Sequence, residues 1–227
     1  MNETAVRDAI QRLCPAFAPA GPPQRTETSL LVPGTADGRA VLAKHPTDLR
    51  PFWRDRCLHE IAVYRALAGQ RPPVTVPRLL AADEARLLLV VERLPGRPIA
   101  AARWPQSAIH PADLAAVIAT LRTLHSWNPD PATFPVVFDY PEQLQRFRRH
   151  GLLTRADHDL LTALFVEVIE ALGWELNHGD AHPGNVLATP DGGHALLDLE
   201  FTGSTRQGST GRCCGPCSKP TGRPGTR

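Results

Sequence analysis

The stretch from His178 to Asn185 reads H-G-D-A-H-P-G-N and constrains the fold more than any other part of this 227-residue chain. Proline lacks a backbone N–H and glycine favours turns, so Pro183 and Gly184 make the chain bend sharply after Asp180. The stretch is therefore a loop and not a helix. It gathers histidine, aspartate and asparagine side chains at fixed spacing, which is typical of a site that carries chemistry.

The residues after this loop predict a β-hairpin. Residues 186–188 and 194–199 read as strands, and the polar residues 189–193 read as the turn between them. Such a hairpin brings Asn185 and Asp198 to its two open ends, where two oxygen ligands can share one hard cation. Glu200 follows as either a further ligand of that cation or an acid that faces solvent.

Protein kinases have a catalytic loop of the form H-x-D-x-x-x-x-N, in which the Asp accepts the substrate hydroxyl proton and the Asn binds Mg²⁺. His178, Asp180 and Asn185 match this spacing. With Gly179 in place of the kinase arginine, and a following strand that ends L-L-D-L-E, the chain resembles the aminoglycoside phosphotransferase and choline kinase family. The resemblance implies that Asp180 is catalytic and that Asn185 and Asp198 bind Mg²⁺.

The resemblance also implies an α+β fold class of the bilobal protein-kinase-like type. Residues 1–94 would form an N-terminal antiparallel sheet lobe that binds the nucleotide, and residues 95–202 a mainly helical C-terminal lobe with the catalytic loop. A chain of this length can bury roughly 70% of its unfolded surface, which is enough for one or two lobes without disulfides. We expect the fold to be incomplete at its C-terminus.

Composition narrows the class of protein further. The longest apolar run, residues 87–91, is far too short to span a bilayer, and the first twenty residues lack an export signal. Cys14 and Cys57 are the only cysteines before residue 203, so no disulfide framework is expected. These features predict a cytoplasmic protein without a membrane partner.

The net charge of +2 averages two unlike parts. Five of the 25 Lys and Arg residues lie after residue 202 and none of the 23 acids does, so the rest of the chain carries a net charge of −3. Nothing in that acidic body forms the basic stripe that nucleic-acid binding requires. We therefore expect no nucleic-acid partner, and no protein partner can be inferred.

Lys44 is the only lysine before residue 203. It ends a predicted hairpin of strands 27–32 and 39–45, joined by a turn at 33–38. One interpretation is an ordinary surface cation on a strand. The other is the strand lysine that binds the α and β phosphates of ATP in kinases, where a compact ammonium group is not replaced by arginine.

The next segments complete the predicted N-terminal lobe. An amphipathic helix over 51–68, closed by Gly69, carries Glu60, which either points to solvent or pairs with Lys44 as in kinases. Strands 78–82 and 86–92 follow. The connection from Glu92 through Leu94 to Gly96 is the expected link between the lobes, where the backbone would bind adenine. Residues 24–29 take the place of a glycine-rich phosphate loop.

Three helices are predicted beyond this link. They cover residues 111–125, then the residues after Asp139 as far as Gly151, and then a run from Thr154 to Leu172. Apolar residues of the last helix from Leu160 to Leu172 are spaced to form a wide buried face.

The composition changes abruptly after Phe201. Residues 203–227 contain no aliphatic or aromatic side chain, so they are predicted to form an aberrant, disordered tail, as out-of-frame translation would produce. The motif C-G-P-C at 214–217 lacks the preceding strand and the helix that a redox site needs.

The favoured function is an ATP- and Mg²⁺-dependent phosphotransferase that transfers the γ-phosphate to a hydroxyl of a small molecule, such as an aminoglycoside-like compound or an amino alcohol. A second interpretation is a truncated nucleotide-binding protein without turnover. A third takes His178, Asp180 and His182 as the metal cluster of a hydrolase.

Overall fold

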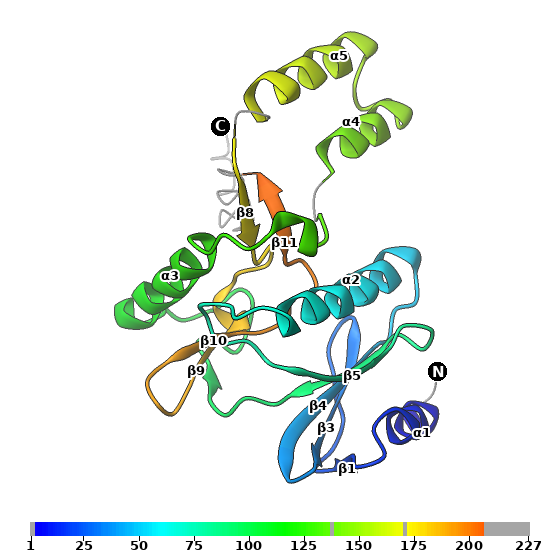
Figure 1. Cartoon of the computed structure of the whole chain (residues 1–227), viewed down its shortest axis with the longest axis vertical. Coiled ribbons are helices and arrows are strands. Elements are labelled where there is room, and N and C mark those ends of the chain that lie inside the picture. Colours follow the sequence, from blue (N-terminus) through cyan, green and yellow to red (C-terminus); the bar gives the residue numbers. More distant parts are fainter. Residues whose placement is uncertain (1–2, 137–138, 170–171, 207–227) are drawn as a thin grey trace, which may run out of the picture.

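An antiparallel sheet forms the N-terminal part of the molecule in the computed structural model, which describes residues 3–136, 139–169 and 172–206 (Figure 1). The strand order is β1-β3-β4-β6-β5, with β2 also paired to β3. The segments of this part are α1 (Glu3–Leu13), β1 (Ala18–Pro19), β2 (Gln24–Arg25), β3 (Ser29–Ala36), β4 (Arg39–Pro46), α2 (Pro51–Ala68), β5 (Leu79–Asp83) and β6 (Leu88–Glu92).

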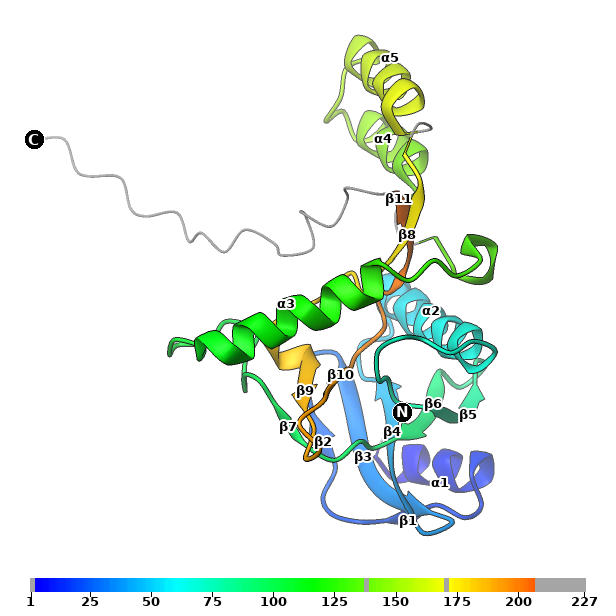
Figure 2. The ribbon, with the colours of Figure 1, turned by 60° about the vertical axis from the view of Figure 1, so that its left-hand side comes forward.

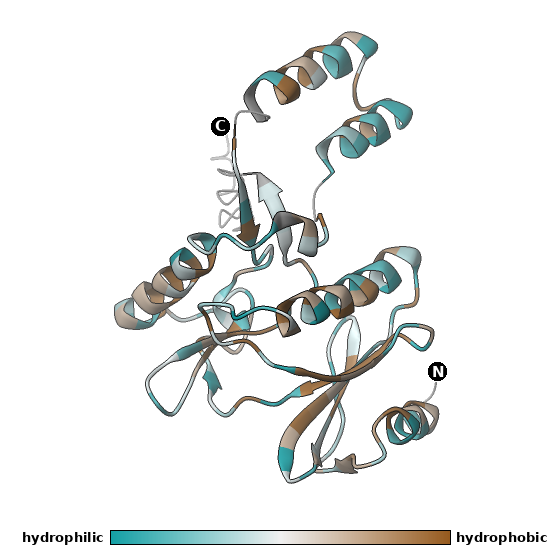
Figure 3. Cartoon of the chain, viewed as in Figure 1, coloured by the Kyte–Doolittle hydropathy of each residue, from teal (hydrophilic) through white to brown (hydrophobic). Residues whose placement is uncertain are grey.

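Alternation along the central strand β6 explains how the sheet is covered. Leu88 and Val90 pack in one buried cluster with α1, whereas Leu89 and Val91 pack in the other with α2. Because successive strand residues point to opposite faces, a fully apolar strand such as β6 must be covered on both. Figure 3 shows the matching hydrophobic colour along the sheet.

The first hairpin is tighter than the predicted turn at 33–38. Strand β3 continues through Pro33 to Ala36, and only Asp37 and Gly38 make the turn. Both residues have positive φ angles, 49° and 75°, as a two-residue type I′ turn requires. The prediction was wrong here because Pro33 and Gly34 were taken as turn residues, although both pair with β4.

The second part of the molecule begins at β7 (Arg97–Pro98) and is mixed helix and strand. It contains α3 (Pro111–His125), a short 3₁₀ helix (Pro131–Thr133), α4 (Tyr140–Arg149), α5 (Arg155–Leu164), a π-helical turn (Phe165–Ile169), β8 (Trp174–Asn177), a second 3₁₀ turn (Pro183–Asn185), β9 (Val186–Ala188), β10 (His194–Leu196) and β11 (Gly203–Arg206). The ends predicted for α2 and α3 agree with the structure.

The predicted buried face of the last helix is not buried in α5, and the burial of residues 168–171 lies outside what the structure describes. Within the described residues, α5 has no buried side chain, and Leu160 remains 60% exposed. Figures 1 and 2 show why: α4 and α5 form a hairpin that extends away from the rest of the molecule. The capping box of Thr154 and Asp157 fixes where α5 begins, but a capping signal does not determine what the helix packs against.

Residues 203–206, predicted to belong to the disordered tail, are ordered. Residues 203–206 form β11, which pairs antiparallel with β8, and Ser204 and Thr205 are buried. Apolar side chains are not required for this pairing, because backbone hydrogen bonds to β8 hold the strand. Residues 207–227 lie outside the described residues. Among the described helices, none combines the length and hydrophobicity of a transmembrane span.

Candidate active site

Lys44 reaches the site because of the alternation of β4. Val41 and Ala43 are buried in the cluster with α1. Leu42 and Lys44 alternate with them along the strand and therefore point to the face covered by α2. Glu60 lies on α2 and points back at the sheet, which brings Lys44 Nζ and Glu60 Oε2 to 2.8 Å. The structure thus brings together the strand lysine and the helix glutamate that the sequence singled out.

Three carboxylates surround the Lys44 ammonium group. Its Nζ atom lies 2.8 Å from Glu60, 2.6 Å from Asp198 and 3.3 Å from Glu200. Burial lowers the pKa of Lys44, but the charges of the three carboxylates outweigh burial and hold the pKa well above its ordinary value. Lys44 is therefore a permanent cation in this site.

The acids of this cluster differ in their protonation. Glu60 is only 2% exposed, and burial raises its pKa to about 7 although Lys44 opposes the rise. Burial also raises the pKa of Glu200. At Asp198, burial acts in the same direction, but the Lys44 charge outweighs it and the pKa is lowered. Asp198 is thus the member held most firmly as a carboxylate.

The same acids fit a divalent cation. One oxygen each from Glu60, Asp198 and Glu200 lie within 4.8 Å of one another. A single lysine neutralises one of three acids, so the cluster carries excess negative charge when all are ionised. Oxygen donors of this kind are the preferred ligands of Mg²⁺. Glu200, which the sequence left between two roles, therefore belongs to the cluster and does not face solvent.

Asp180 lies in a loop that packs closely against the segment after Asp198. Gly179 has a φ of +77°, and a Cβ atom at this position would overlap the backbone oxygen of Phe201. Only glycine combines that backbone angle with so close an approach. This contact explains physically why the loop reads H-G-D, and it holds Asp180 beside the Lys44 cluster.

His178 has a structural role in this loop. It is completely buried, its Nδ1 accepts from the Asp180 N–H at 3.4 Å, and its Nε2 donates to the Leu197 carbonyl at 2.9 Å. Because both ring nitrogens are used, His178 cannot bind a metal. His182 likewise uses Nδ1 to accept from the Gly184 N–H at 3.1 Å. The geometry of the described residues therefore does not form the His178, Asp180 and His182 metal cluster.

Asn185 supports the loop with its side-chain amide. Its Nδ2 donates to the Asp180 carbonyl at 3.1 Å, and its own carbonyl accepts from the Leu197 N–H at 2.9 Å. The amide nitrogen is thus occupied, which leaves Oδ1 as the atom able to bind a cation. The backbone bond to Leu197 also fixes Asn185 beside the strand end that carries Asp198.

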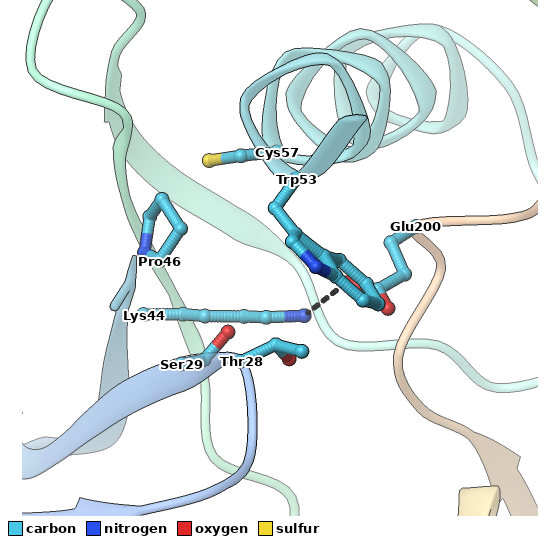
Figure 4. Close-up of a pocket in the computed structure, with 7 residues that line it drawn as sticks. All are labelled: Thr28, Ser29, Lys44, Pro46, Trp53, Cys57 and Glu200. Atoms are coloured by element: carbon cyan, nitrogen blue, oxygen red, sulfur yellow. Dashed lines mark hydrogen bonds and ion pairs between the residues drawn. The ribbon is translucent and has the colours of Figure 1, made fainter. Parts of the chain in front are cut away.

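Helix α2 is hydrogen-bonded to the segment that follows Asp198. His59 Nε2 donates to the Thr202 carbonyl at 2.7 Å, and Arg56 donates to the Glu200 carbonyl at 3.4 Å. Figure 4 shows Trp53 reaching from α2 over Lys44, and a dashed line joins the Lys44 ammonium group to Glu200. Thr28, Ser29, Pro46 and Cys57 complete this small cavity. Thr28 and Ser29 come from the segment predicted to replace a glycine-rich loop.

Arg103 is the site residue that sequence reasoning missed. Its guanidinium group binds both carboxylate oxygens of Asp180, at 2.5 and 2.9 Å. No sequence motif identifies this residue, because it lies in an irregular segment between β7 and α3. The absence of acids between Glu92 and Asp113, where Arg93, Arg97 and Arg103 lie, is the one signal that was present.

Glu92 and Leu94 lie at the predicted connection. Glu92 is the last residue of β6 and pairs with Val41, while its side chain binds Arg78 at 3.1 Å. Leu94 is half-buried and follows Arg93, whose N–H donates to Ala40. The side chain of Glu92 is therefore engaged in a surface ion pair, and any contact with a base would come from the backbone.

The chain matches known proteins over most of its described length. Residues 27–205 match the model of the phosphotransferase enzyme family. A search of curated proteins found no match. Similar solved structures include the macrolide 2'-phosphotransferase MphH from Brachybacterium faecium, at TM-score 0.59 and 19% identity, covering 89% of this chain and 73% of that one.

Two further structures show the same fold. The streptomycin–ATP ternary complex of APH(2")-IIa matches at TM-score 0.55 and 13% identity over 90% of this chain and 72% of that one. The choline kinase LicA from Streptococcus pneumoniae matches at TM-score 0.54 and 12% identity over 90% of this chain and 70% of that one. At such identities the likeness establishes the fold and not the acceptor.

Proposed function

We propose that this chain, which belongs to the phosphotransferase enzyme family, transfers the γ-phosphoryl group of ATP to a hydroxyl group of a small molecule. The observation that carries the proposal is the ion pair of Lys44 with Glu60 and Asp198, directly beside the loop that presents Asp180. A strand lysine held by a helix glutamate is the arrangement that phosphoryl transfer uses to bind phosphates.

Asp180 acts in this proposal as the base. The acceptor hydroxyl oxygen forms a bond to the γ-phosphorus, the bond from that phosphorus to the β–γ bridging oxygen breaks, and ADP leaves with the bond electrons. The hydroxyl proton passes to an Asp180 oxygen. Asn185 and the Gly179 contact with Phe201 hold the loop in place, so the carboxylate needs little reorganisation before the reaction.

The acids around Lys44 would hold the metal. Mg²⁺ would be bound by Asp198, with Asn185 Oδ1 and Glu200 as further oxygen ligands, and when bound it would neutralise charge on the phosphates. Lys44 would then exchange carboxylates for phosphate oxygens while Glu60 keeps it in place. In the bilobal kinase-like arrangement that we propose, backbone groups of the connection from Glu92 to Leu94 would bind the adenine.

The acceptor is proposed only as a class. The matching structures are named for a macrolide phosphotransferase, aminoglycoside phosphotransferases and a choline kinase, all of which act on small molecules. The shared chemistry is a hydroxyl group that can reach Asp180. An aminoglycoside-like compound and an amino alcohol were the acceptors expected from the sequence.

A nucleotide-binding protein without turnover is the second candidate. The exposed apolar residues of α5 favour this candidate. A small-molecule site is an enclosed pocket, and the described residues form no such pocket against α5. Both candidates predict nucleotide binding, so only the appearance of a phosphorylated product separates them.

Thermal unfolding with and without Mg²⁺ and ATP tests the nucleotide site. A ligand that binds only the folded state raises the melting temperature by mass action, and Lys44→Ala should remove most of that rise. Arg39→Ala is the matched control, because Arg39 is an exposed cation on the same strand. The proposal fails if Lys44→Ala responds to the nucleotide as the wild-type chain does.

A further inference from the structure

The ion pair between Arg103 and Asp180 covers the proposed base. Both guanidinium nitrogens contact the carboxylate, one on each oxygen, at 2.5 and 2.9 Å. The Asp180 side chain is 9% exposed and the Arg103 side chain is 49% exposed, so the guanidinium stands between the carboxylate and solvent. An acceptor hydroxyl must displace at least one of these two bonds before Asp180 can take its proton.

Arg103 cannot move far when it is displaced. The segment that carries it is bonded to the catalytic loop and its hairpin: the Ile99 N–H donates to Val186 at 2.9 Å and the Ala100 N–H donates to Pro183 at 3.2 Å. Only two residues separate Ala100 from Arg103. The guanidinium, which also lies 6.0 Å from the Trp104 ring, therefore stays at the mouth of the acceptor site after it leaves the carboxylate.

The segment that carries Arg103 is positively charged. Within the described residues, Arg103 forms an ion pair with Asp180 alone, and residues 93–112 contain no acid. His182 also faces Asp180, with Nε2 at 3.9 Å from Oδ2. Burial lowers the pKa of His182, and the Arg103 charge acts in the same direction, against the charge of Asp180. A displaced Arg103 thus has no carboxylate partner within its own segment.

We infer that Arg103 is an acceptor-selecting residue: it caps Asp180 and, once displaced, favours an acceptor that carries an anionic group beside its reacting hydroxyl. A carboxylate or phosphate on the acceptor would replace Asp180 as the partner of the planar guanidinium fork. A cationic amino group at the same place would be repelled. The inference rests on the proposed function and narrows its acceptor class away from polycationic amino sugars.

The same cap keeps water from the base. A water molecule that approached Asp180 beside a bound nucleotide would be activated in the way an acceptor hydroxyl is, and the nucleotide would be hydrolysed. Because the guanidinium occupies both oxygens, hydrolysis should be slow in the wild-type chain. Removal of the cap should therefore raise hydrolysis, which is a readout that requires no known acceptor.

The experiment uses the full chain with Mg²⁺ and ATP and measures ADP formation with no acceptor, with glucuronate and with glucosamine. These two sugars share a ring and hydroxyl groups and differ in charge. The wild-type chain should form ADP about tenfold faster with glucuronate than with glucosamine, the ratio expected from one partly solvated charge at short range. Arg103→Gln should raise acceptor-free hydrolysis several-fold, and Arg103→Glu should reverse the preference.

Arg103→Lys and Arg97→Gln are the companion variants. Lysine keeps the charge but not the fork, so it should keep the preference for glucuronate while losing part of the protection against hydrolysis. Arg97 is an exposed arginine of the same segment, paired with Asp113 at 3.6 Å, and its loss should change neither readout. Melting curves of each variant with Mg²⁺ and ATP show whether it is folded and binds nucleotide.

Equal ADP formation with both sugars in the wild-type chain would overturn the inference, as would unchanged or slower hydrolysis in a folded Arg103→Gln. If the wild-type chain is folded but is not stabilised by Mg²⁺ and ATP, the proposed function itself has failed. A chain that binds the nucleotide but shows no charge preference leaves the proposed function standing and removes only the role of Arg103.

Discussion

Two ion pairs in one site are built in opposite ways. Lys44 and Glu60 meet in the interior, between β4 and α2, with side-chain exposures of 16% and 2%. Arg103 reaches Asp180 from an irregular segment and stays half exposed. The first pair is enclosed between a strand and a helix, whereas the second faces solvent on one side. The difference indicates that the proposed nucleotide side of the site is preformed and that the proposed acceptor side is capped.

The contact between Gly179 and Phe201, which joins the two sides, offers a large expected effect on stability. Gly179→Ala should lower the free energy of unfolding by about 3–4 kcal/mol, because alanine adds both the strain of a positive φ and an overlap with the Phe201 backbone. Chemical denaturation measures this change.

Gly192→Ala is its control. Gly192 has a similar φ of +80°, but a Cβ atom there meets nothing within 4 Å, so the cost should be only about 1 kcal/mol. Equal costs at the two glycines would show that the loop does not depend on its packing against Phe201.

The pH dependence of stability tests the preformed side. Burial raises the pKa of Glu60 from 4.5 to about 7, so the folded chain binds this proton more tightly than the unfolded chain does. Its contribution to stability is complete below pH 4.5 and is lost as the pH rises towards and through 7. The free energy of unfolding should therefore fall by on the order of 3 kcal/mol over this window.

Glu60→Gln should remove most of that fall, since glutamine does not titrate. Glu84→Gln is the control, because Glu84 is an exposed acid for which the same substitution should leave the pH profile unchanged. Denaturant unfolding at several pH values between 4.5 and 8 measures all three chains. A wild-type profile that rises over this window would mean that the Lys44 charge, and not burial, sets the protonation of Glu60.

The smallest effect on the free energy of unfolding is expected on the hairpin of α4 and α5, which extends away from the rest of the molecule. Leu160→Ser on α5 should change the free energy of unfolding by less than about 0.5 kcal/mol, because the side chain is already largely in solvent. Leu89→Ala in the fully covered strand β6 should cost about 2–5 kcal/mol. A loss at Leu160 as large as that at Leu89 would show that α5 is packed in solution.

Sequence reasoning predicted the preformed side better than the capped side, for a physical reason. Lys44 and Glu60 lie on regular elements, where alternation along a strand and spacing along a helix determine which way a side chain points. The spacing of His178, Asp180 and Asn185 identified the loop. Arg103 has no periodicity to reveal it, because an irregular segment directs its side chains by tertiary contacts alone.

The other differences have the same origin. Local signals placed the ends of α2 and α3 and the cap at Thr154, yet the predicted buried face at Leu160 is exposed, because amphipathic spacing shows which face is apolar and not what covers it. Similarly, residues 203–206 have no apolar side chain, but β8 offers them an open edge. Strand pairing of this kind depends on a partner far away in the sequence.

The proposed phosphoryl transfer can be observed by ³¹P NMR of the full chain with Mg²⁺, ATP and a mixture of a macrolide, streptomycin, choline and glucuronate. We expect the γ-phosphate signal to disappear while ADP and a new phosphomonoester signal grow, and we expect Asp180→Asn to slow this by roughly 10² to 10⁴ with nucleotide binding unchanged. An Asp180→Asn chain that forms the phosphomonoester at the wild-type rate, or a folded wild-type chain that binds the nucleotide and leaves every hydroxyl unmodified, would contradict the proposal.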